Sequence, residues 1–190
     1  IIKDVLVRIC LSLQLTSQYK VENKKEKLED FKTAISSTVR SLSNSQEIEI
    51  SFGNQAIKSS KNSIRLPDLE QGSNKLNYEK IRAIADSKSL NLRFSDVKTL
   101  KKYEPEGNIS KKLYSISEKI RCEKIGTSYF KGVKKNIEKY YYKRLSGLDL
   151  KSSEDKIIES FENYLRVKFL NFKNESQIDK RLNPFKKDLN

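Results

Sequence analysis

The side chains that most often carry out chemistry are scarce in this sequence. Histidine is absent, and only two cysteines, Cys10 and Cys122, are present. Histidine is the usual general base and the commonest metal ligand, and a zinc site without histidine needs more thiolates than two. The sequence also lacks the Gly-x-x-x-x-Gly-Lys-Ser/Thr pattern of a phosphate-binding loop. We therefore expect no catalytic residues, no metal ligands and no ATP hydrolysis in this chain, and the two cysteines fit a reducing cytoplasm.

The stretch from Ser117 to Gly126 combines charged residues, a thiol and a glycine. Glu118 and Arg121 stand three residues apart, close enough to pair on one helical surface, and Glu123 follows. Gly126 allows a neighbouring helix to approach closely. An apolar stripe at three- and four-residue steps runs through the same segment: Leu113, Ile116, Ile120, Cys122 and Ile125. The spacing predicts a long central helix that is capped by Ser110 and that ends or kinks at Gly126-Thr127.

Residues 131–144 interleave basic residues with three consecutive tyrosines, Tyr140, Tyr141 and Tyr142. The predicted basic face consists of Lys131, Lys134, Lys135, Lys139, Lys143 and Arg144. Not all three tyrosines can face the core of one helix, so we expect at least one to be exposed. The chain carries a net charge of +14, although its lysines are spread along the whole length. A solvated helix face, a nucleic-acid-binding surface and a contact for an acidic protein all fit this pattern.

The remaining patterns predict mostly helices. A helical stripe covers 28–42, and short strands are expected at 47–52 and 64–67, where apolar and polar residues alternate. A helix capped by Asn77 is expected, with a pattern that blurs toward Asp96, Val97 and Leu100 before Pro105 and Gly107 stop it. The last helix is expected to bury an apolar ridge: Ile157, Ile158, Phe161, Leu165, Phe169 and Phe172. The predicted fold class is mainly α, a helical bundle with a small two-stranded β ribbon near residues 47–67.

The chain divides into three predicted parts. Residues 1–27 form an N-terminal extension of unknown role, and its apolar-rich part, residues 1–16, is too short and too charged to span a bilayer. Residues 28–175 form the helical domain, and residues 176–190 form a loose C-terminal tail in which the apolar pattern fades. With 190 residues, the chain is long enough to bury a substantial core.

Several segments, in order, resemble a known family. They are Phe31 to Arg40, Glu47 to Gly53, Arg65 to Leu69, Ala85 to Arg93 with Ser95 and Asp96, Glu118 to Gly126, and Arg144 to Gly147. Together they are similar to the N-terminal helical region of the T subunit of aerobic cobaltochelatase, which inserts cobalt into the corrin ring in cobalamin biosynthesis. The resemblance covers roughly residues 28–172.

The resemblance implies a non-catalytic subunit that works with an AAA+ ATPase subunit and with a large subunit that carries out the chelation. The complex would need ATP, magnesium and cobalt, none of them held by this chain. In the family a von Willebrand A-type domain follows the helical region, and we expect it to be absent here. Candidate partner contacts are Arg65, Asp86, Asp96, Glu118, Arg121 and Glu123. For each of these residues, an ion pair inside the helical bundle is the alternative.

The sequence departs from the family in two places. Relatives tend to place histidine before the position of Asp96 and again a few residues later, whereas Ser95 and Leu100 or Lys101 occupy that area here. Ala85 replaces a glycine that is common in the family. Two other functions stay open: a basic helical nucleic-acid-binding module centred on residues 131–144, and a degenerate remnant of the chelatase subunit.

Overall fold

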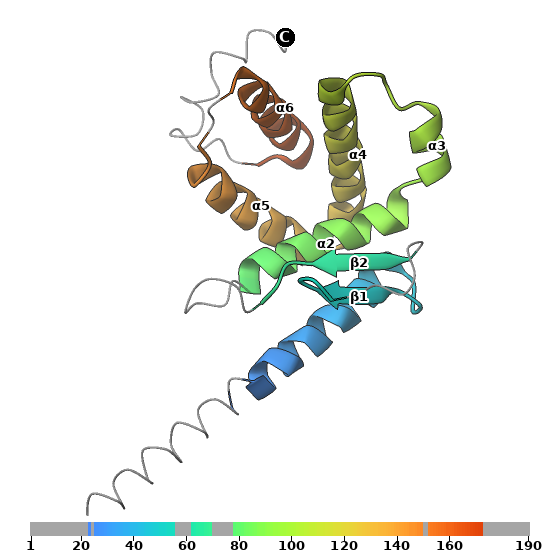
Figure 1. Cartoon of the computed structure of the whole chain (residues 1–190), viewed down its shortest axis with the longest axis vertical. Helices are drawn as coiled ribbons and strands as arrows, with labels where there is room; N and C mark the ends of the chain where they lie inside the picture. Colours follow the sequence, from blue (N-terminus) through green and yellow to red (C-terminus); the bar gives the residue numbers. More distant parts are fainter. Residues whose placement is uncertain (1–22, 24, 56–61, 70–77, 150–151, 173–190) are drawn as a thin grey trace, which may run out of the picture. The chain divides into compact units, whose positions relative to one another are not determined.

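The computed structural model describes residues 23, 25–55, 62–69, 78–149 and 152–172 (Figure 1). It is mainly helical with one two-stranded sheet, which confirms the predicted fold class. The chain forms two compact units, Ile1–Thr38 and Val39–Asn190. The predicted extension at 1–27 and the predicted tail at 176–190 fall mostly or wholly outside the described residues. Within the described part, no helix is both long enough and apolar enough to cross a lipid bilayer.

The described part of the first unit is a helix over residues 25–38. Leu28 and Ile35, seven residues apart, are buried, as the predicted stripe requires. On the outside of the helix, Lys32 Nζ lies 2.8 Å from Glu29 Oε1, a pair at i, i+3 spacing. The amphipathic pattern of this segment is therefore reproduced in the structure.

The second unit begins with helical residues 39–43 and continues with two strands and five helices among its described residues. Their bounds are β1 Glu49–Phe52, β2 Ser63–Leu66, α2 Tyr78–Phe94, α3 Val97–Lys102, α4 Asn108–Tyr129, α5 Lys131–Ser146 and α6 Ser153–Leu170. Helix α4 packs against α2, α5 and α6, so it is the central helix that the sequence predicted. The core between these helices is built from Leu42, Leu90, Ile120, Val133, Ile137, Tyr141, Leu145, Leu170 and Phe172.

Strands β1 and β2 pair in parallel, with Ile50 opposite Ile64 and Phe52 opposite Leu66. A parallel pair cannot be joined by a tight hairpin turn, and ten residues, 53–62, lie between the two strands in the sequence. Strand β2 packs against α2 (Figure 1). At this contact, Lys88 Nζ donates a hydrogen bond of 2.8 Å to the carbonyl oxygen of Arg65. The predicted ribbon therefore exists, and it is attached to the helix that leads into the core.

The helix that was expected to reach Pro105 is instead divided into α2 and α3, so that prediction is wrong. The break lies at Ser95 and Asp96, and Asp96 is the N-cap of α3. Its carboxylate accepts hydrogen bonds from Lys98 N at 3.0 Å and from Thr99 Oγ1 at 2.6 Å. A capping aspartate favours a new helix start over continuation of the old helix. Asn77, the predicted cap of α2, lies outside the described residues.

The predicted boundaries of α4 are also corrected. The N-cap is Gly107, at a φ of 87°, and Ser110 lies inside the first turn. At the other end, the helix runs through Gly126 and Thr127 and stops at Tyr129. Gly126 acts by close packing: a Cβ atom added there would lie 2.3 Å from Leu90 Cδ2 of α2. The predicted close approach at Gly126 is confirmed, while the predicted helix end is wrong.

The predicted apolar ridge of the last helix is buried only at Phe172, which follows the end of α6. Ile157 and Phe169 are exposed, and Ile158, Phe161 and Leu165 are only partly buried. The buried residues of α6 are Glu159, Ser160, Glu162, Arg166 and Leu170. The N-cap of α6 is Ser152, whose Oγ accepts a hydrogen bond of 3.0 Å from Asp155 N. Its orientation differs because its charged residues find partners inside the bundle.

Candidate functional site: a charged cavity and an aromatic surface

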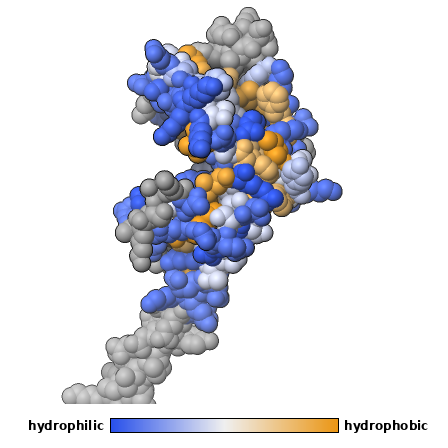
Figure 2. All heavy atoms as spheres, turned by 90° about the vertical axis from the view of Figure 1, so that its right-hand side faces the viewer, coloured by the Kyte–Doolittle hydropathy of each residue, from blue (hydrophilic) through white to orange (hydrophobic). Residues whose placement is uncertain are grey.

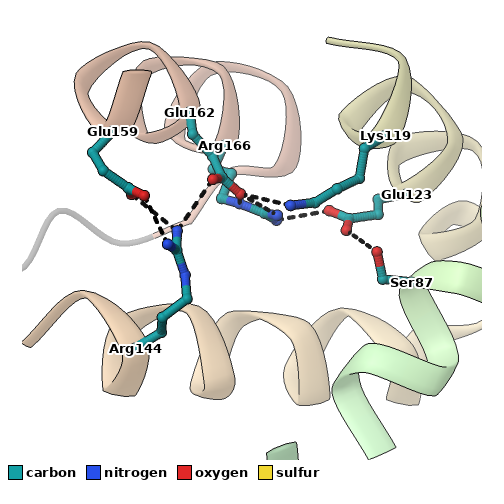
Figure 3. A network of polar contacts seen from close by, with 7 residues as sticks. All are labelled: Ser87, Lys119, Glu123, Arg144, Glu159, Glu162 and Arg166. Atoms are coloured by element: carbon teal, nitrogen blue, oxygen red, sulfur yellow. Dashed lines mark hydrogen bonds and ion pairs between the residues drawn. The ribbon is translucent and has the colours of Figure 1, made fainter. Parts of the chain in front are cut away.

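Arg166 is the centre of a buried ion network among the helices (Figure 3). Its Nη1 lies 2.7 Å from Glu123 Oε2 of α4, and its Nη2 lies 2.8 Å from Glu162 Oε1. Its Nε donates to the same Glu162 oxygen at 2.9 Å. The three side chains are at most 6% exposed, so these charge-assisted hydrogen bonds are shielded from water.

Arg144, Lys119 and Ser87 extend the network to α5, α4 and α2. Arg144 forms a bidentate ion pair with Glu159, with hydrogen bonds of 2.7 and 2.9 Å, and donates a third hydrogen bond to Glu162 Oε2 at 3.1 Å. Lys119 Nζ lies 2.9 Å from Glu162 Oε1, and Ser87 Oγ donates to Glu123 Oε1 at 2.6 Å. The seven residues in Figure 3 therefore connect four helices through polar contacts.

The electrostatics of the network keep its charges in place at neutral pH. Burial alone raises the pKa of Glu162, but the positive charges of Lys119, Arg166 and Arg144 outweigh this effect and lower the pKa to about 2. Burial disfavours the charged form of Arg166, yet Glu123 and Glu162 raise the pKa of its guanidinium above the ordinary value. These groups are therefore fixed charges near pH 7 and do not exchange protons.

A cavity of about 200 Å³ lies beside this network. Its lining comes from α2, α4, α5 and α6: Ala83, Ile84, Ser87, Lys88, Lys119, Glu123, Ile137, Tyr140, Tyr141, Arg144, Glu162 and Arg166. Tyr141 is 2% exposed, and its hydroxyl is buried without a hydrogen-bond partner. The guanidinium carbon of Arg166 lies 4.8 Å from the centre of the Tyr141 ring, and that of Arg144 lies 5.4 Å from it. Such an unsatisfied buried hydroxyl is uncommon in folded proteins.

The buried thiol of Cys122 is poorly suited to nucleophilic chemistry. Burial, reinforced by the nearby negative charge of Glu118, raises the pKa of Cys122 to about 12. The reactive form of cysteine is the thiolate, and at pH 7, well below this pKa, almost all of the Cys122 thiol is protonated. Among the described residues, no group of three or more histidine, cysteine, aspartate or glutamate side chains is arranged to hold a metal ion.

The structure separates the predicted partner contacts into buried and surface residues. Glu123 belongs to the ion network, and Asp86, 1% exposed, accepts a hydrogen bond of 2.8 Å from Asn136 Nδ2. Burial raises the pKa of Asp86, although the Asn136 hydrogen bond opposes this shift. Arg65 and Asp96 are exposed, on β2 and at the start of α3. The side chain of Arg121 is 48% exposed, and its Nε lies 2.7 Å from Glu118 Oε2.

An aromatic and charged surface forms where the end of α2, which leads into α3, contacts α4. We call it the α3 surface and define it as Phe94, Asp96, Val97, Arg121 and Tyr129. Arg121 Nη2 donates to the carbonyl oxygen of Phe94 at 2.6 Å, and the rings of Phe94 and Tyr129 stack with their centres 6.4 Å apart. Val97 is 63% exposed and Tyr129 is 72% exposed. Figure 2, which faces the α3 side of the molecule, shows hydrophobic residues next to hydrophilic ones.

The predicted basic face of α5 is divided between solvent and interior. Lys131, Lys135, Lys139 and Lys143 are exposed and Lys134 is partly buried, whereas Arg144 turns toward Glu159 and Glu162. Lys139 and Lys143 both pair with Glu79 of α2. The expectation of an exposed tyrosine is wrong. Tyr141 is buried, Tyr140 is half-buried beside the cavity, and Tyr142 is half-buried with its ring centre 6.0 Å from that of Phe172.

Sequence reasoning missed most of the network. Ser87, Lys119, Glu159, Glu162 and Arg166 were not among the candidate site residues. One signal was available: Glu162 and Arg166 stand at i, i+4 spacing within a helix rich in apolar residues. Oppositely charged residues at this spacing form pairs on a helix surface. Their burial depends on Glu123 and Arg144, which come from other helices and carry no local signal.

Comparison with known proteins gives a family assignment. No solved structure matches the chain significantly. A family model described as cobalamin biosynthesis protein CobT matches residues 25–161, more than two thirds of the chain. The matched region includes the α3 surface and every network residue up to Glu159 of α6. The resemblance found in the sequence is therefore confirmed, and the chain belongs to the CobT family of cobalamin biosynthesis proteins.

Proposed function

We propose that this chain is a non-catalytic docking subunit of the ATP-dependent cobaltochelatase, and that it binds the AAA+ ATPase subunit in the cytoplasm. Membership of the CobT family supports a role in cobalamin biosynthesis. The observation that carries the docking role is the α3 surface, which presents an exposed tyrosine and an arginine on α4 and an exposed valine on α3.

The composition of the α3 surface suits protein recognition. Tyrosine and arginine are enriched at protein interfaces and among the residues that dominate binding energy. The guanidinium of Arg121 is held by Glu118 and by the carbonyl oxygen of Phe94, so less side-chain freedom is lost when a partner binds. We propose Asp96, Arg121 and Tyr129 as partner contacts, with Arg65 as a second contact on β2.

The buried residues support a scaffold role for the helices beneath this surface. Glu162 has a pKa near 2 and Cys122 a pKa near 12, so neither is tuned to transfer protons or attack a substrate near pH 7. In this proposal ATP and magnesium are used by the AAA+ subunit. Cobalt, as the substrate, is handled by the large subunit, and this chain transmits movement between its partners through α2, α4, α5 and α6.

Co-purification with the AAA+ subunit tests the proposal. The 190-residue chain, immobilised through a tag, is expected to retain the ATPase subunit at low salt in the presence of ATP and magnesium. Tyr129→Ala is expected to weaken retention at least tenfold, because exposed tyrosines at interface centres are frequent hot spots. Phe169→Ala is the matched control, since Phe169 is an exposed aromatic residue of α6 outside the α3 surface. Absence of retention under these conditions would overturn the proposal.

The nucleic-acid alternative has weaker structural support. Base stacking needs exposed aromatic rings, and none of the three tyrosines of residues 140–142 is exposed. The exposed lysines of α5 still provide positive charge, so binding to mixed-sequence DNA and RNA is best measured as a function of salt. A steep loss of affinity with rising salt, from a tight starting value, would favour this alternative.

A further inference from the structure

The cavity beside the ion network has a feature that the docking role does not use. Tyr141 lines the cavity, is almost completely buried and leaves its hydroxyl without a hydrogen-bond partner. The network residues around it have their charges satisfied, so this hydroxyl stands out as an unused donor and acceptor. A buried polar group of this kind is costly unless something pairs with it.

We propose that this cavity binds a small organic carboxylate. The anionic oxygens are expected to accept hydrogen bonds from Tyr141 and Lys119, and the body of the molecule is expected to rest against Ala83, Ile84 and Ile137. This site is distinct from the α3 surface, so the inference does not rest on the proposed docking function.

The charge of the lining favours an anion. Four cationic side chains line the cavity, from Lys88, Lys119, Arg144 and Arg166. Two carboxylates of the lining, Glu123 and Glu162, and Glu159 behind Arg144 balance three of these charges. One positive charge is therefore in excess, and an incoming carboxylate would balance it without breaking an existing pair. A cation would meet repulsion from the same residues.

Hydrogen-bond donors remain available around the cavity. The ammonium of Lys119 can donate three hydrogen bonds, and its identified partner is Glu162. Lys88 likewise donates to the carbonyl oxygen of Arg65, which leaves further donors on its ammonium. Together with the Tyr141 hydroxyl, these groups offer donors from α2, α4 and α5, which suits the two oxygens of a carboxylate.

The apolar part of the lining and the volume limit the rest of the ligand. Ala83, Ile84 and Ile137 provide hydrocarbon contacts. A cavity of 150 Å³ is large enough for benzene, and this one is about 200 Å³. Aromatic or short branched carboxylates are therefore of suitable size. Inorganic phosphate lacks the apolar body and is expected to bind more weakly.

Titration of the full chain with sodium benzoate, followed by amide chemical shifts in NMR spectra, tests the site. Benzoate is expected to shift resonances of α2, α4 and α5 around the cavity. Benzamide, which has the same shape without the charge, is expected to bind at least tenfold more weakly. A parallel titration with phosphate measures how much of the binding comes from negative charge alone. Equal binding of phosphate or benzamide would overturn the proposal, as would the absence of shifts at the cavity.

Three variants locate the binding. Tyr141→Phe removes one hydrogen bond, worth about 1 kcal/mol, and is expected to weaken benzoate binding about fivefold.

Lys119→Gln is expected to weaken benzoate binding at least tenfold. The matched control is Lys124→Gln, at an exposed lysine of the same helix outside the lining, and it is expected to leave benzoate binding unchanged. If Lys119→Gln does not fold, Lys88→Gln on the exposed rim provides the same test. Unchanged affinity in the lining variants would contradict the site. The Tyr141→Phe protein is expected to retain the AAA+ subunit as the unsubstituted chain does, because Tyr141 lies outside the α3 surface. The co-purification experiment therefore tests the docking proposal separately from the cavity.

Discussion

The ion network and the α3 surface reverse the usual placement of side chains. In the network, Glu123, Glu162 and Arg166 are buried within the bundle. At the α3 surface, Val97 and Tyr129 face solvent. The two regions differ in how their side chains are paired. Each of these buried charges has an oppositely charged neighbour at 2.7–3.1 Å. At the α3 surface, Tyr129 stacks on Phe94 but leaves most of its ring exposed to solvent.

The comparison shows that the availability of interaction partners, more than residue type, decides whether these side chains are buried or exposed. A buried charge without a partner is expensive, but a network with complete hydrogen bonding is tolerated and fixes how the helices fit together. Exposed apolar groups cost little individually and remain available for a partner. The two regions should therefore respond in opposite ways to substitution, the network through stability and the α3 surface through binding.

The largest expected effect comes from Arg166→Met. This change leaves Glu123 and Glu162 buried with less positive charge nearby, and breaking a buried ion pair from one side costs about 3–5 kcal/mol. Denaturation by urea, monitored by circular dichroism, measures the loss in the free energy of unfolding. The matched change at the α3 surface, Arg121→Met, is expected to cost less than about 1 kcal/mol because that pair is half-exposed. Equal losses for the two variants would remove the distinction between the regions.

Acid should weaken the ion network through protonation of Glu162. The pKa of Glu162 is about 2 in the folded chain, against an ordinary value of 4.5. A lowered folded-state pKa contributes stability above the unfolded value, and that stability is lost as pH falls from about 4.5 to about 2. The loss is about 3 kcal/mol by linkage.

Urea denaturation at a series of pH values measures this dependence. Glu162→Gln should be less stable at neutral pH and should show a flatter decline over the same acidic range. A decline as steep as that of the unsubstituted chain would mean that other carboxylates govern the acid response.

A smaller loss of stability is expected from a substitution at Gly126, which lies on α4 between the ion network and the α3 surface. Helix α4 carries Glu123 in the network and Tyr129 at the α3 surface, and Gly126 lies between them against Leu90. Gly126→Ala is expected to destabilise the chain by about 1–2 kcal/mol, because overpacking outweighs the better helix propensity of alanine. Gly132→Ala is the control, since a Cβ atom at Gly132 meets nothing within 4 Å. A more stable Gly126→Ala protein would show that α2 and α4 can move apart freely.

The sequence predicts some of these elements well and others poorly, for physical reasons. In α5, Val133, Ile137 and Leu145 recur at helical spacing and are buried, because apolar periodicity reports burial when the core is apolar. In α6 the same reasoning selected Ile157 and Phe169, which are exposed, because the pattern cannot show that Arg166 meets Glu123 from α4. The candidate partner contacts were likewise divided by tertiary structure: Asp86 and Glu123 are interior, while Arg65, Asp96 and Arg121 reach the surface.

The most direct test of the account compares two properties of Tyr129→Ala. Tyr129 is 72% exposed and stacks on Phe94, so its loss is expected to lower the free energy of unfolding by less than about 1 kcal/mol. Its affinity for the AAA+ subunit, measured by calorimetry with ATP and magnesium present, is expected to fall at least tenfold, while Phe169→Ala binds like the unsubstituted chain. If Tyr129→Ala binds the AAA+ subunit with unchanged affinity, the α3 surface is not the docking site and the central claim is contradicted.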